Sequence, residues 1–227
     1  ESLSGLVVHQ LKHPGAPFVF GGMASVMDMQ STIFSYGAPE FQRGNTLMAE
    51  MAHHFDLPNF GTGGTSDAQV LDGQALLEVI SSCMVAYLAG ANLIHDVGYV
   101  ESGLTTSYEM LVSMNETIGL VNKFVEGVRI EEETLALDVI EKVGPGGHFL
   151  AEEHTVRHCR DNWRPKVFDR ENREDWELAG QQDLGDRAAE YVQGILKSHE
   201  GESLDAQIVV ELESTIEQAR DRLDPEQ

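Results

Sequence analysis

Basic residues are scarce in this chain: 15 lysines and arginines stand against 38 aspartates and glutamates, which gives a net charge of −23. Binding to nucleic acid or to anionic lipid needs a broad positive surface, so we expect neither nucleic acid nor a membrane as a partner. The chain also lacks an apolar run of the roughly 18 residues needed to span a bilayer. Most acidic residues lie from Glu131 onward, where they indicate solvated helix surfaces.

Cysteine is scarce as well. The two thiols, Cys83 and Cys159, are too few for a disulfide framework and fit a reducing compartment, so we predict a cytoplasmic protein. Cys83 lies in an apolar stretch at helical spacing, which predicts a packed side chain. Cys159 follows His158, but we assign it no catalytic role.

The stretch PNFGTGGTSDAQ, residues 58–69, shows what the chain does contain. A short run ending in Phe60 breaks into a glycine loop, and apolar residues then recur at helical spacing from Val70 to Leu88. Ser66 and Gln69, three residues apart, are typical of a capping box at a helix start. The predicted order is strand, glycine loop, helix, a junction that binds ligands in α/β folds. A tight turn that needs glycine only for its backbone angles is the open alternative.

The same plan recurs along the chain. Further strands are predicted at residues 18–22 (FVFGG), 92–97 (NLIHDV) and 148–150 (HFL). Helices are predicted at residues 3–11, from 39 to about 55, from a Thr106–Glu109 capping box to 125, at 131–143, at 183–198 and at about 204–223. Strands separated by helices at this spacing indicate βαβ units and a parallel sheet.

The predicted fold class is therefore α/β, of the (β/α)8 TIM-barrel type. About four βα units make half of such a barrel, which takes roughly 200–250 residues when complete. We predict that residues 1–150 form a half barrel and that residues 151–227 form a C-terminal helical extension. The connection at residues 23–38 is too long for a simple loop, and loops of that length are often functional.

Parallel strands would bring their carboxyl ends to one rim. The residues expected on that rim are Phe20, Gly21, Gly22, Gly61, Thr62, Gly63, Gly64, His95 and Asp96, with Asp28, Tyr36, Asp67, Tyr99, Glu101 and Tyr108 on overhanging loops or helix starts. His95 and Asp96 are adjacent in a predicted strand, so we expect their side chains on opposite faces. Aromatic rings and carboxylates without lysine or arginine suit a cation, especially a quaternary ammonium group. For each residue the alternative is a capping carboxylate or a packed ring.

Two histidines, His154 and His158, are spaced i and i+4 on a predicted helix and could bind a metal together with His148. The segment lacks the HExxH pattern of a zinc protease, and such pairs are often surface residues. We therefore predict no metal site.

Several long segments resemble one family. They are GGMASVMDMQSTIFSYGAPE, LPNFGTGGTSDAQVLDGQA, LAGANLIHDVGYVESGLTTSYEMLV and ETLALDVIEKVGPGGHFLAEEHTVRH. Together they resemble the trimethylamine methyltransferase superfamily over residues 3–200. The resemblance implies a TIM barrel that moves a methyl group from a methylated amine to Co(I) of a separate corrinoid protein. The classical trimethylamine enzymes carry pyrrolysine, which the resemblance would place near Gly63, Gly64 and Thr65. The ordinary residues here resemble the branch that acts on quaternary amines such as glycine betaine.

The resemblance also implies roles for the rim residues. Phe20, Tyr36, Tyr99 and Tyr108 become candidates for a cage around the substrate cation. His95, Asp96 and Glu101 become catalytic candidates that orient the substrate or balance its charge. Gly61, Thr62, Gly63 and Gly64 become the loop that faces the corrinoid. The corrinoid (cobalamin) would be carried by the partner protein, and we predict no tightly bound cofactor.

Family members are about twice as long, and the chain resembles their C-terminal half. A half barrel exposes sheet edges and an apolar interior, so we expect a homo-oligomer or a partner that supplies the N-terminal half. A non-catalytic half barrel that binds a partner or a small cation is the main alternative. A TIM-barrel lyase or aldolase ranks last, because the rim segments hold no lysine.

Overall fold

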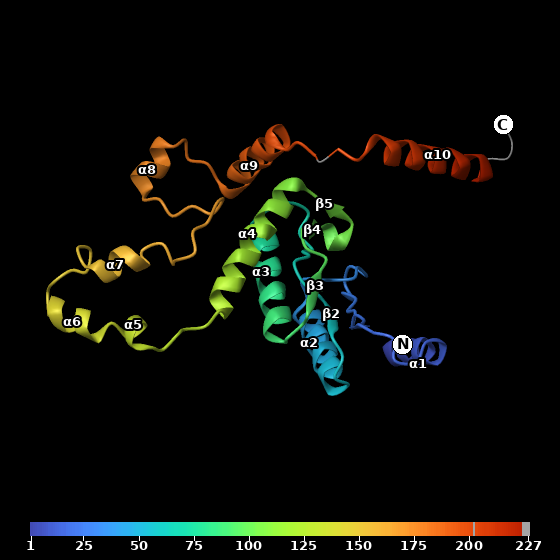
Figure 1. Ribbon diagram of the computed structural model, residues 1–227, viewed down its shortest axis with the longest axis horizontal. Helices are drawn as coiled ribbons and strands as arrows, with labels where there is room; N and C mark the ends of the chain where they lie inside the picture. The colour runs from blue at the N-terminus through green and yellow to red at the C-terminus, as the bar shows by residue number, and fades with distance from the viewer. Residues whose placement is uncertain (202, 224–227) are drawn as a thin grey trace. The chain divides into compact units, whose positions relative to one another are not determined.

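The computed structural model describes residues 1–201 and 203–223. Its first half alternates helices and short strands, as the sequence predicts (Figure 1). The elements are α1 (Ser2–Lys12), β1 (Phe20–Gly21), α2 (Pro39–His54), β2 (Asn59–Thr62), α3 (Gly73–Leu88), β3 (Leu93–His95) and α4 (Tyr108–Val125). The predicted βαβ organisation over these residues is confirmed.

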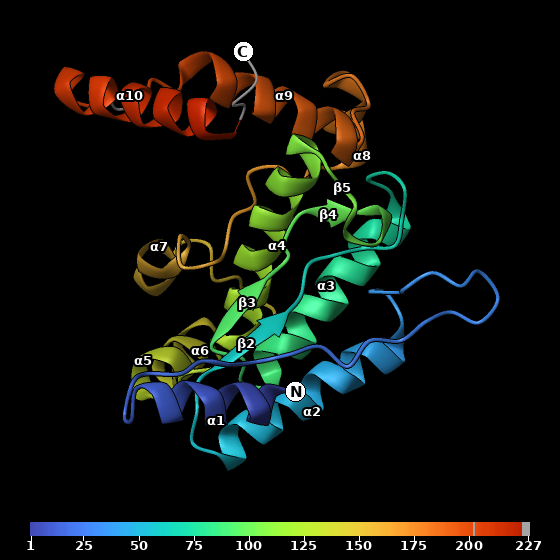
Figure 2. The same ribbon diagram turned by 90° about the vertical axis from the view of Figure 1, so that its right-hand side faces the viewer.

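The strands β1, β2 and β3 form one parallel sheet in chain order. α2 and α3 pack against β2, and Figure 2 shows β2 and β3 in front of α3 and α4. Phe20 in β1 is buried and packs near Phe55, just after α2. Phe60 and Leu93 are register partners that remain 41% and 53% exposed. The sheet therefore has one covered face and one face on which Phe60 and Leu93 remain partly exposed.

The core lies between α3 and α4. Val79 and Cys83 of α3 meet Met110, Met114 and Val121 of α4 in one buried cluster. These residues recur at spacings of four and seven, which places them on one face of each helix. Burial of this face holds the two helices against each other and behind the strands.

Both helix starts differ from the predicted capping boxes. The side chain of Asp72 caps α3 by accepting the Ala75 amide at 3.0 Å, and the side chain of Ser107 caps α4. The predicted boxes at Ser66–Gln69 and at Thr106–Glu109 are therefore wrong. Ser66 lies six residues before the Asp72 cap, and its hydroxyl donates to Glu78 at 2.6 Å instead.

The prediction of a fourth strand at residues 148–150, and with it of about four βα units, is also wrong for the described chain. His148, Phe149 and Leu150 form no strand, and Phe149 and Leu150 are exposed. The carbonyl of Phe149 accepts the Thr155 hydroxyl at 2.7 Å and the Glu152 amide at 3.0 Å. It is thus occupied in starting α7 (Glu153–His158) rather than in a ladder. No closed barrel forms within the described residues.

Two small elements between β3 and α4 escape the sequence pattern. β4 (Tyr99–Val100) and β5 (Thr105–Thr106) pair antiparallel around the short 3-10 helix η1 (Glu101–Gly103). Each strand has two residues, too short for any periodicity. η1 contains Glu101 and Ser102 at φ near +50°, a left-handed conformation that non-glycine residues rarely adopt.

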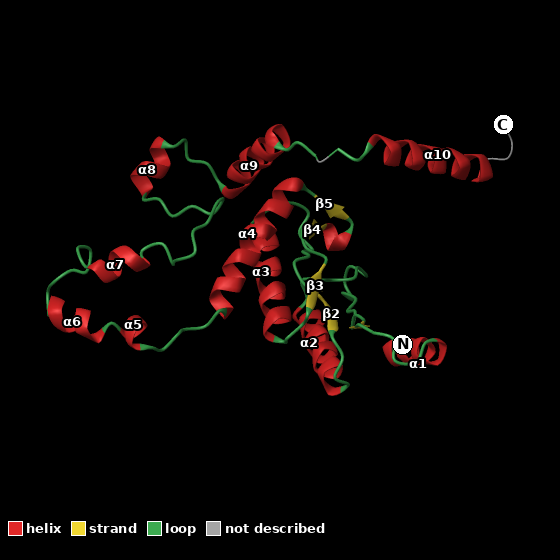
Figure 3. Cartoon of the chain, viewed as in Figure 1, coloured by secondary structure: helices red, strands yellow, loops and turns green. Residues whose placement is uncertain are grey.

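The predicted helix at residues 131–143 is divided into α5 (Glu132–Leu135) and α6 (Leu137–Val143), which Figure 3 shows in red. Ala136 between them has φ +45° and ends the first helix. α7 and α8 (Arg173–Leu178) follow as short helices. The predicted C-terminal helices are confirmed as α9 (Leu184–Ser198) and α10 (Ala206–Leu223).

Contacts divide the chain into one unit of residues 1–192 and another of residues 193–227. The predicted boundary at residue 150 stays a prediction. Residues 166–187 make hydrogen bonds with α4 and with one another inside the first unit. Among the described helices, none combines the length and the apolar character that crossing a membrane requires.

Candidate functional site

The glycine loop after β2 packs tightly against its own chain. A Cβ on Gly64 would lie 2.7 Å from Cε of Met114, and one on Gly63 would lie 3.3 Å from Cα of Cys83. Gly64 also has φ +86°, and its amide donates to Ser82 Oγ at 3.0 Å. These glycines are therefore explained by close packing and backbone angles. A role for Gly61, Thr62, Gly63 and Gly64 in facing a corrinoid stays a prediction.

His95 ends β3 and is held from three sides. Its ring stacks on Phe60 of β2, with centroids 4.0 Å apart and planes 7° from parallel. Its Nδ1 lies 2.8 Å from Oδ1 of Asp96, and its Nε2 lies 3.4 Å from Oγ1 of Thr62. The Asp96 carboxylate therefore places a negative charge beside Nδ1, and Nε2 faces the Thr62 hydroxyl.

The expectation that His95 and Asp96 point to opposite faces is wrong. The strand ends at His95, and Asp96 has φ +69°, which turns its side chain back toward the histidine ring. The Thr65 hydroxyl holds this turn by donating to the Asp96 carbonyl at 2.6 Å. Both side chains keep more than a quarter of their surface exposed, so solvent or a ligand can reach them.

Asp67 accepts hydrogen bonds from two loops at the rim. Its carboxylate accepts the backbone amides of Tyr36 at 2.8 Å and Gly37 at 2.9 Å, and also the Ser35 hydroxyl. On the other side it accepts the Ser102 hydroxyl at 2.9 Å. One side chain thus ties the long loop before α2 to η1. Asp67 was expected over the rim, with helix capping as the alternative; α3 begins at residue 73, so the capping alternative is wrong.

Tyr36 lies half-buried where these loops meet. Its ring meets Phe34 and Phe41 edge-on, with centroids 4.6 and 5.1 Å away. Burial raises the pKa of Tyr36, and the negative charges of Asp96 and Asp67 raise it further. The phenol therefore stays neutral close to two carboxylates. A cation would be attracted to this place both by the charges and by the ring face.

The other predicted residues lie on four different elements. Phe20 is 3% exposed and packs near Phe55 on the helix side of the sheet. Tyr99 lies in β4 and is 39% exposed, while Tyr108 begins α4 and is 64% exposed. Glu101 is half-buried in η1 and precedes Ser102, whose hydroxyl donates to Asp67. The group brought together by named contacts is Phe60, Thr62, His95 and Asp96, with Tyr36 and Asp67 beside it.

A second polar centre was missed by the sequence analysis. Glu116 of α4 is buried, and its Oε1 accepts the amides of Lys166, Val167 and Phe168 at 2.5–3.3 Å. From the other side, Arg187 Nε donates to the Val167 carbonyl at 2.8 Å. An acidic residue on an otherwise apolar helix face is the signal that could have found Glu116.

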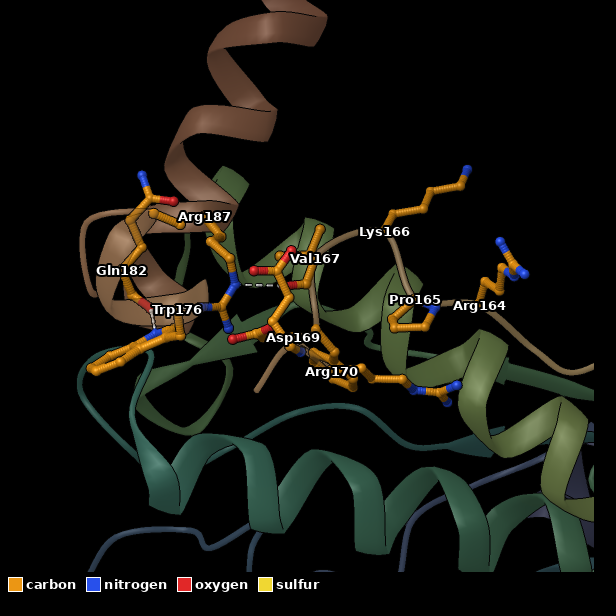
Figure 4. A pocket seen from close by; sticks show the side chains of 12 residues that line it. Arg164, Pro165, Lys166, Val167, Asp169, Arg170, Trp176, Gln182 and Arg187 are labelled. Carbon is orange, nitrogen blue, oxygen red and sulfur yellow. Dashed lines mark hydrogen bonds between the residues drawn. The ribbon is translucent and has the colours of Figure 1, made fainter. Parts of the chain in front are cut away.

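Beside this turn lies a cavity of about 540 Å³ (Figure 4). Its lining residues are Arg164, Pro165, Lys166, Val167, Phe168, Asp169, Arg170, Glu171, Trp176, Ala179, Gln182 and Arg187. None of the rim residues predicted from the sequence lines it. Arg187 and the Trp176 indole both donate to the Gln182 carbonyl, at 2.6 and 2.9 Å, so this wall is fixed by hydrogen bonds.

The fold and the rim define an α/β protein with parallel strands and an acidic, aromatic rim at their carboxyl ends. A sequence profile of the family "Trimethylamine methyltransferase (MTTB)" matches residues 1–223. The chain therefore belongs to the trimethylamine methyltransferase family, and the resemblance seen in the sequence is confirmed.

Named relatives include two kinds of enzyme. Trimethylamine methyltransferase MttB of Desulfitobacterium hafniense is 37% identical over 221 residues, which are 97% of this chain and 45% of that protein. MttB of Methanosarcina barkeri is 36% identical over 96% of this chain and 44% of its own length. Glycine betaine methyltransferase of D. hafniense strain Y51 is 33% identical over 96% of this chain and 46% of its own length. The chain thus spans less than half the length of these relatives.

Proposed function

We propose that this chain is the C-terminal half barrel of a methyltransferase that takes a methyl group from a quaternary or tertiary methylated amine, with glycine betaine as the model substrate. The acceptor would be Co(I) of a corrinoid protein. The observation that carries the proposal is the placement of Tyr36 within the field of Asp67 and Asp96, at the carboxyl ends of β2 and β3. Family membership and relatives of both substrate types support it.

The chemistry asks little of the protein beyond binding and orientation. When the methyl group leaves, the C–N bonding pair stays on nitrogen, so a quaternary amine departs as a neutral tertiary amine and needs no proton. The corrinoid supplies the electron pair that forms the new bond to carbon. The chain must hold the cation, aim one methyl group and exclude water. Tyr36 with Asp67 and Asp96 would hold the cation, and His95, fixed by Asp96 and Phe60, would orient it.

The proposal gives the open sheet face a partner. Within the described residues, β1 and β3 each pair on one side only, and Phe60 and Leu93 remain exposed on the uncovered face. We infer that the missing half of a TIM barrel covers this face, either from a longer chain or from another subunit. Phe20 has no part in the cage of this proposal, because its ring is buried on the opposite side.

The test is an assay of methyl transfer to free Co(I) cobalamin, and the change in cobalt absorbance measures the transfer. The chain is assayed alone and together with a protein supplying the remaining barrel half, against glycine betaine, carnitine and trimethylamine. Substrate-dependent loss of Co(I), with release of the demethylated amine, supports the proposal. No turnover with any amine in the completed barrel refutes it.

A non-catalytic binding module is the second candidate, favoured by the same Tyr36–carboxylate grouping in a chain with an open barrel face. Calorimetry separates the two. Saturable binding of glycine betaine without methyl transfer in the completed barrel supports a binding module, whereas binding with turnover supports the enzyme.

A further inference from the structure

Three side chains with metal-binding groups meet between α5 and α7. Oε1 of Glu133 lies 2.9 Å from Nε2 of His158 and 4.0 Å from Nε2 of His154. One nitrogen or oxygen atom from each residue lies within 4.8 Å of the others. The two imidazole rings, one helical turn apart on α7, have centroids 4.5 Å apart. Helical spacing of i and i+4 thus puts both rings on the side of α7 that faces Glu133.

We propose that Glu133, His154 and His158 form a binding site for a divalent transition metal ion of the Zn²⁺ type. Two imidazoles and one carboxylate are a ligand set that suits zinc, at 2.0–2.2 Å per bond. Tetrahedral ligands at that bond length stand roughly 3.3–3.6 Å apart. The observed separations of 2.9 and 4.0 Å lie on either side of this value, so small side-chain rotations suffice to close the site.

The surroundings of His158 match those of a metal ligand. Its second nitrogen, Nδ1, lies 2.6 Å from Oδ2 of Asp161, so a carboxylate fixes the ring while Nε2 points at Glu133. Metal-bound histidines nearly always donate their other N–H to such an outer carboxylate or carbonyl. The outer partner also makes the imidazole a better electron donor.

The turn before α7 is held by contacts that do not use these ligands, whereas α5 meets α7 through Glu133 itself, with Nε2 of His154 2.8 Å from the Glu133 carbonyl oxygen. Lys142 of α6 pairs with Glu152 at 2.6 Å, and Thr155 of α7 donates to the Phe149 carbonyl at 2.7 Å. The turn that leads into α7 is therefore fixed by contacts other than those of the proposed ligands. His148, which the sequence analysis grouped with the two histidines, is not part of the cluster; Glu133 takes its place, from a segment 21 residues before His154. The proposal replaces the sequence-based prediction of no metal site.

An ion-pair network is the competing explanation. Arg157 NH1 lies 2.8 Å from the same Glu133 oxygen, so the carboxylate could serve only to bind Arg157 and protonated His158. The two explanations give opposite results for Arg157→Ala. If Glu133 serves only an ion-pair network, the variant loses one partner of that carboxylate and binds no zinc. If Glu133 is a metal ligand, the variant loses only a competitor for it and binds zinc at least as tightly as the wild type.

The experiment titrates the full chain with Zn²⁺ at pH 7.5 against a chelating indicator, and with Co²⁺ by visible absorption. The variants are His154→Ala, His158→Ala, Glu133→Gln, Asp161→Asn and Arg157→Ala. His148→Ala is the matched histidine control. Cys159→Ser tests the exposed thiol next to His158. Circular dichroism checks that each variant keeps its helices.

We expect one zinc equivalent. Asp161→Asn, which changes the outer partner of His158, should weaken the zinc affinity about 10- to 100-fold. Loss of either histidine should weaken it at least about 100-fold. His148→Ala, Cys159→Ser and Arg157→Ala should keep the affinity, and Co²⁺ should give the absorption of a four-coordinate ion. The proposal is overturned if the chain binds no stoichiometric zinc, or if binding survives His154→Ala and His158→Ala in folded protein. The outcome is independent of methyl transfer.

Discussion

Nδ1 of His95 lies 2.8 Å from Oδ1 of Asp96, although the two residues are neighbours in the chain. In a continuing strand their side chains would point to opposite faces. The contact exists because β3 ends at His95 and Asp96 takes a left-handed backbone conformation, with φ +69°. The Phe60 ring and the Thr62 hydroxyl complete the setting of the imidazole. The end of β3 therefore carries a histidine whose ring stacks on Phe60 and whose Nδ1 lies beside a carboxylate.

This contact predicts the tautomer of His95. Asp96→Ala removes the negative charge beside Nδ1, which favours a proton on that nitrogen, so the share of the Nδ1–H tautomer should fall. Imidazole ¹⁵N shifts in NMR spectra measure it, and the exposed His199 should be unaffected. An unchanged His95 signal in the variant would show that Asp96 does not set the tautomer.

Tyr36 should dominate the affinity for a methylated ammonium ion. Tyr36→Ala should weaken glycine betaine binding roughly 3- to 30-fold, the range of cation–π interactions. Calorimetry measures the change, and Tyr87→Ala on α3 is the control because Tyr87 is exposed and lies outside the rim. Equal loss in both variants would exclude a specific cage at Tyr36.

Asp67 should matter for stability as well as for charge. Asp67→Asn keeps the shape but turns an amide group toward backbone N–H donors that the carboxylate now satisfies. We expect the free energy of unfolding to fall by about 2–3 kcal/mol, as for hydrogen bonds to a charged group. Urea denaturation measures this, with the exposed Asp138→Asn as a control. A change below that of the control would mean that the loop is held without Asp67.

Glu116 should hold the turn at residues 166–168. In Glu116→Gln a neutral amide oxygen replaces the buried carboxylate oxygen that accepts three backbone amides. The free energy of unfolding should therefore fall by about 3 kcal/mol. Hydrogen exchange should speed up at the amides of Lys166, Val167 and Phe168. The exposed Glu141→Gln serves as the control. If exchange at this turn is unchanged, the turn does not depend on Glu116.

The two thiols should differ in reactivity. Burial raises the pKa of Cys83 to about 11, whereas Cys159 is exposed. Only the thiolate reacts, so iodoacetamide at pH 8 should label Cys159 in the folded chain and both thiols in urea. Mass spectrometry of Cys159→Ser should then show no labelling without urea. Rapid labelling of Cys83 would show that α3 and α4 open readily.

The same pKa shift has a consequence for stability. The folded state keeps the Cys83 thiol protonated, whereas the unfolded chain ionises it near pH 9. The unfolded state is therefore favoured progressively as pH rises from about 9 to about 11. Over this interval the free energy of unfolding of Cys83→Ala should fall by about 2–3 kcal/mol less than that of the wild type. Identical pH slopes for both proteins would contradict the buried thiol.

Periodic stretches of the chain were predictable because their pattern is local. Apolar spacing located α2, α3 and α4, and glycine-ended runs located β1, β2 and β3, which pair in the predicted parallel order. The HFL run at residues 148–150 failed because strand formation needs a neighbour to accept its hydrogen bonds, and no sequence window contains that neighbour. Ser66 failed as a cap because α3 begins only at Gly73, where Asp72 supplies the capping carboxylate.

By itself, the sequence determined the acidic character, the alternation of strands and helices, and membership in the trimethylamine methyltransferase family, because composition, spacing and similarity are properties of the chain alone. Only the tertiary structure decided that Asp67 joins two distant loops, that Asp96 turns back to His95, and that Glu133 rather than His148 meets the two histidines of α7. Each of these depends on a left-handed residue or on a contact between distant segments. Such features leave no period in the sequence, because they are selected by the packing that surrounds them.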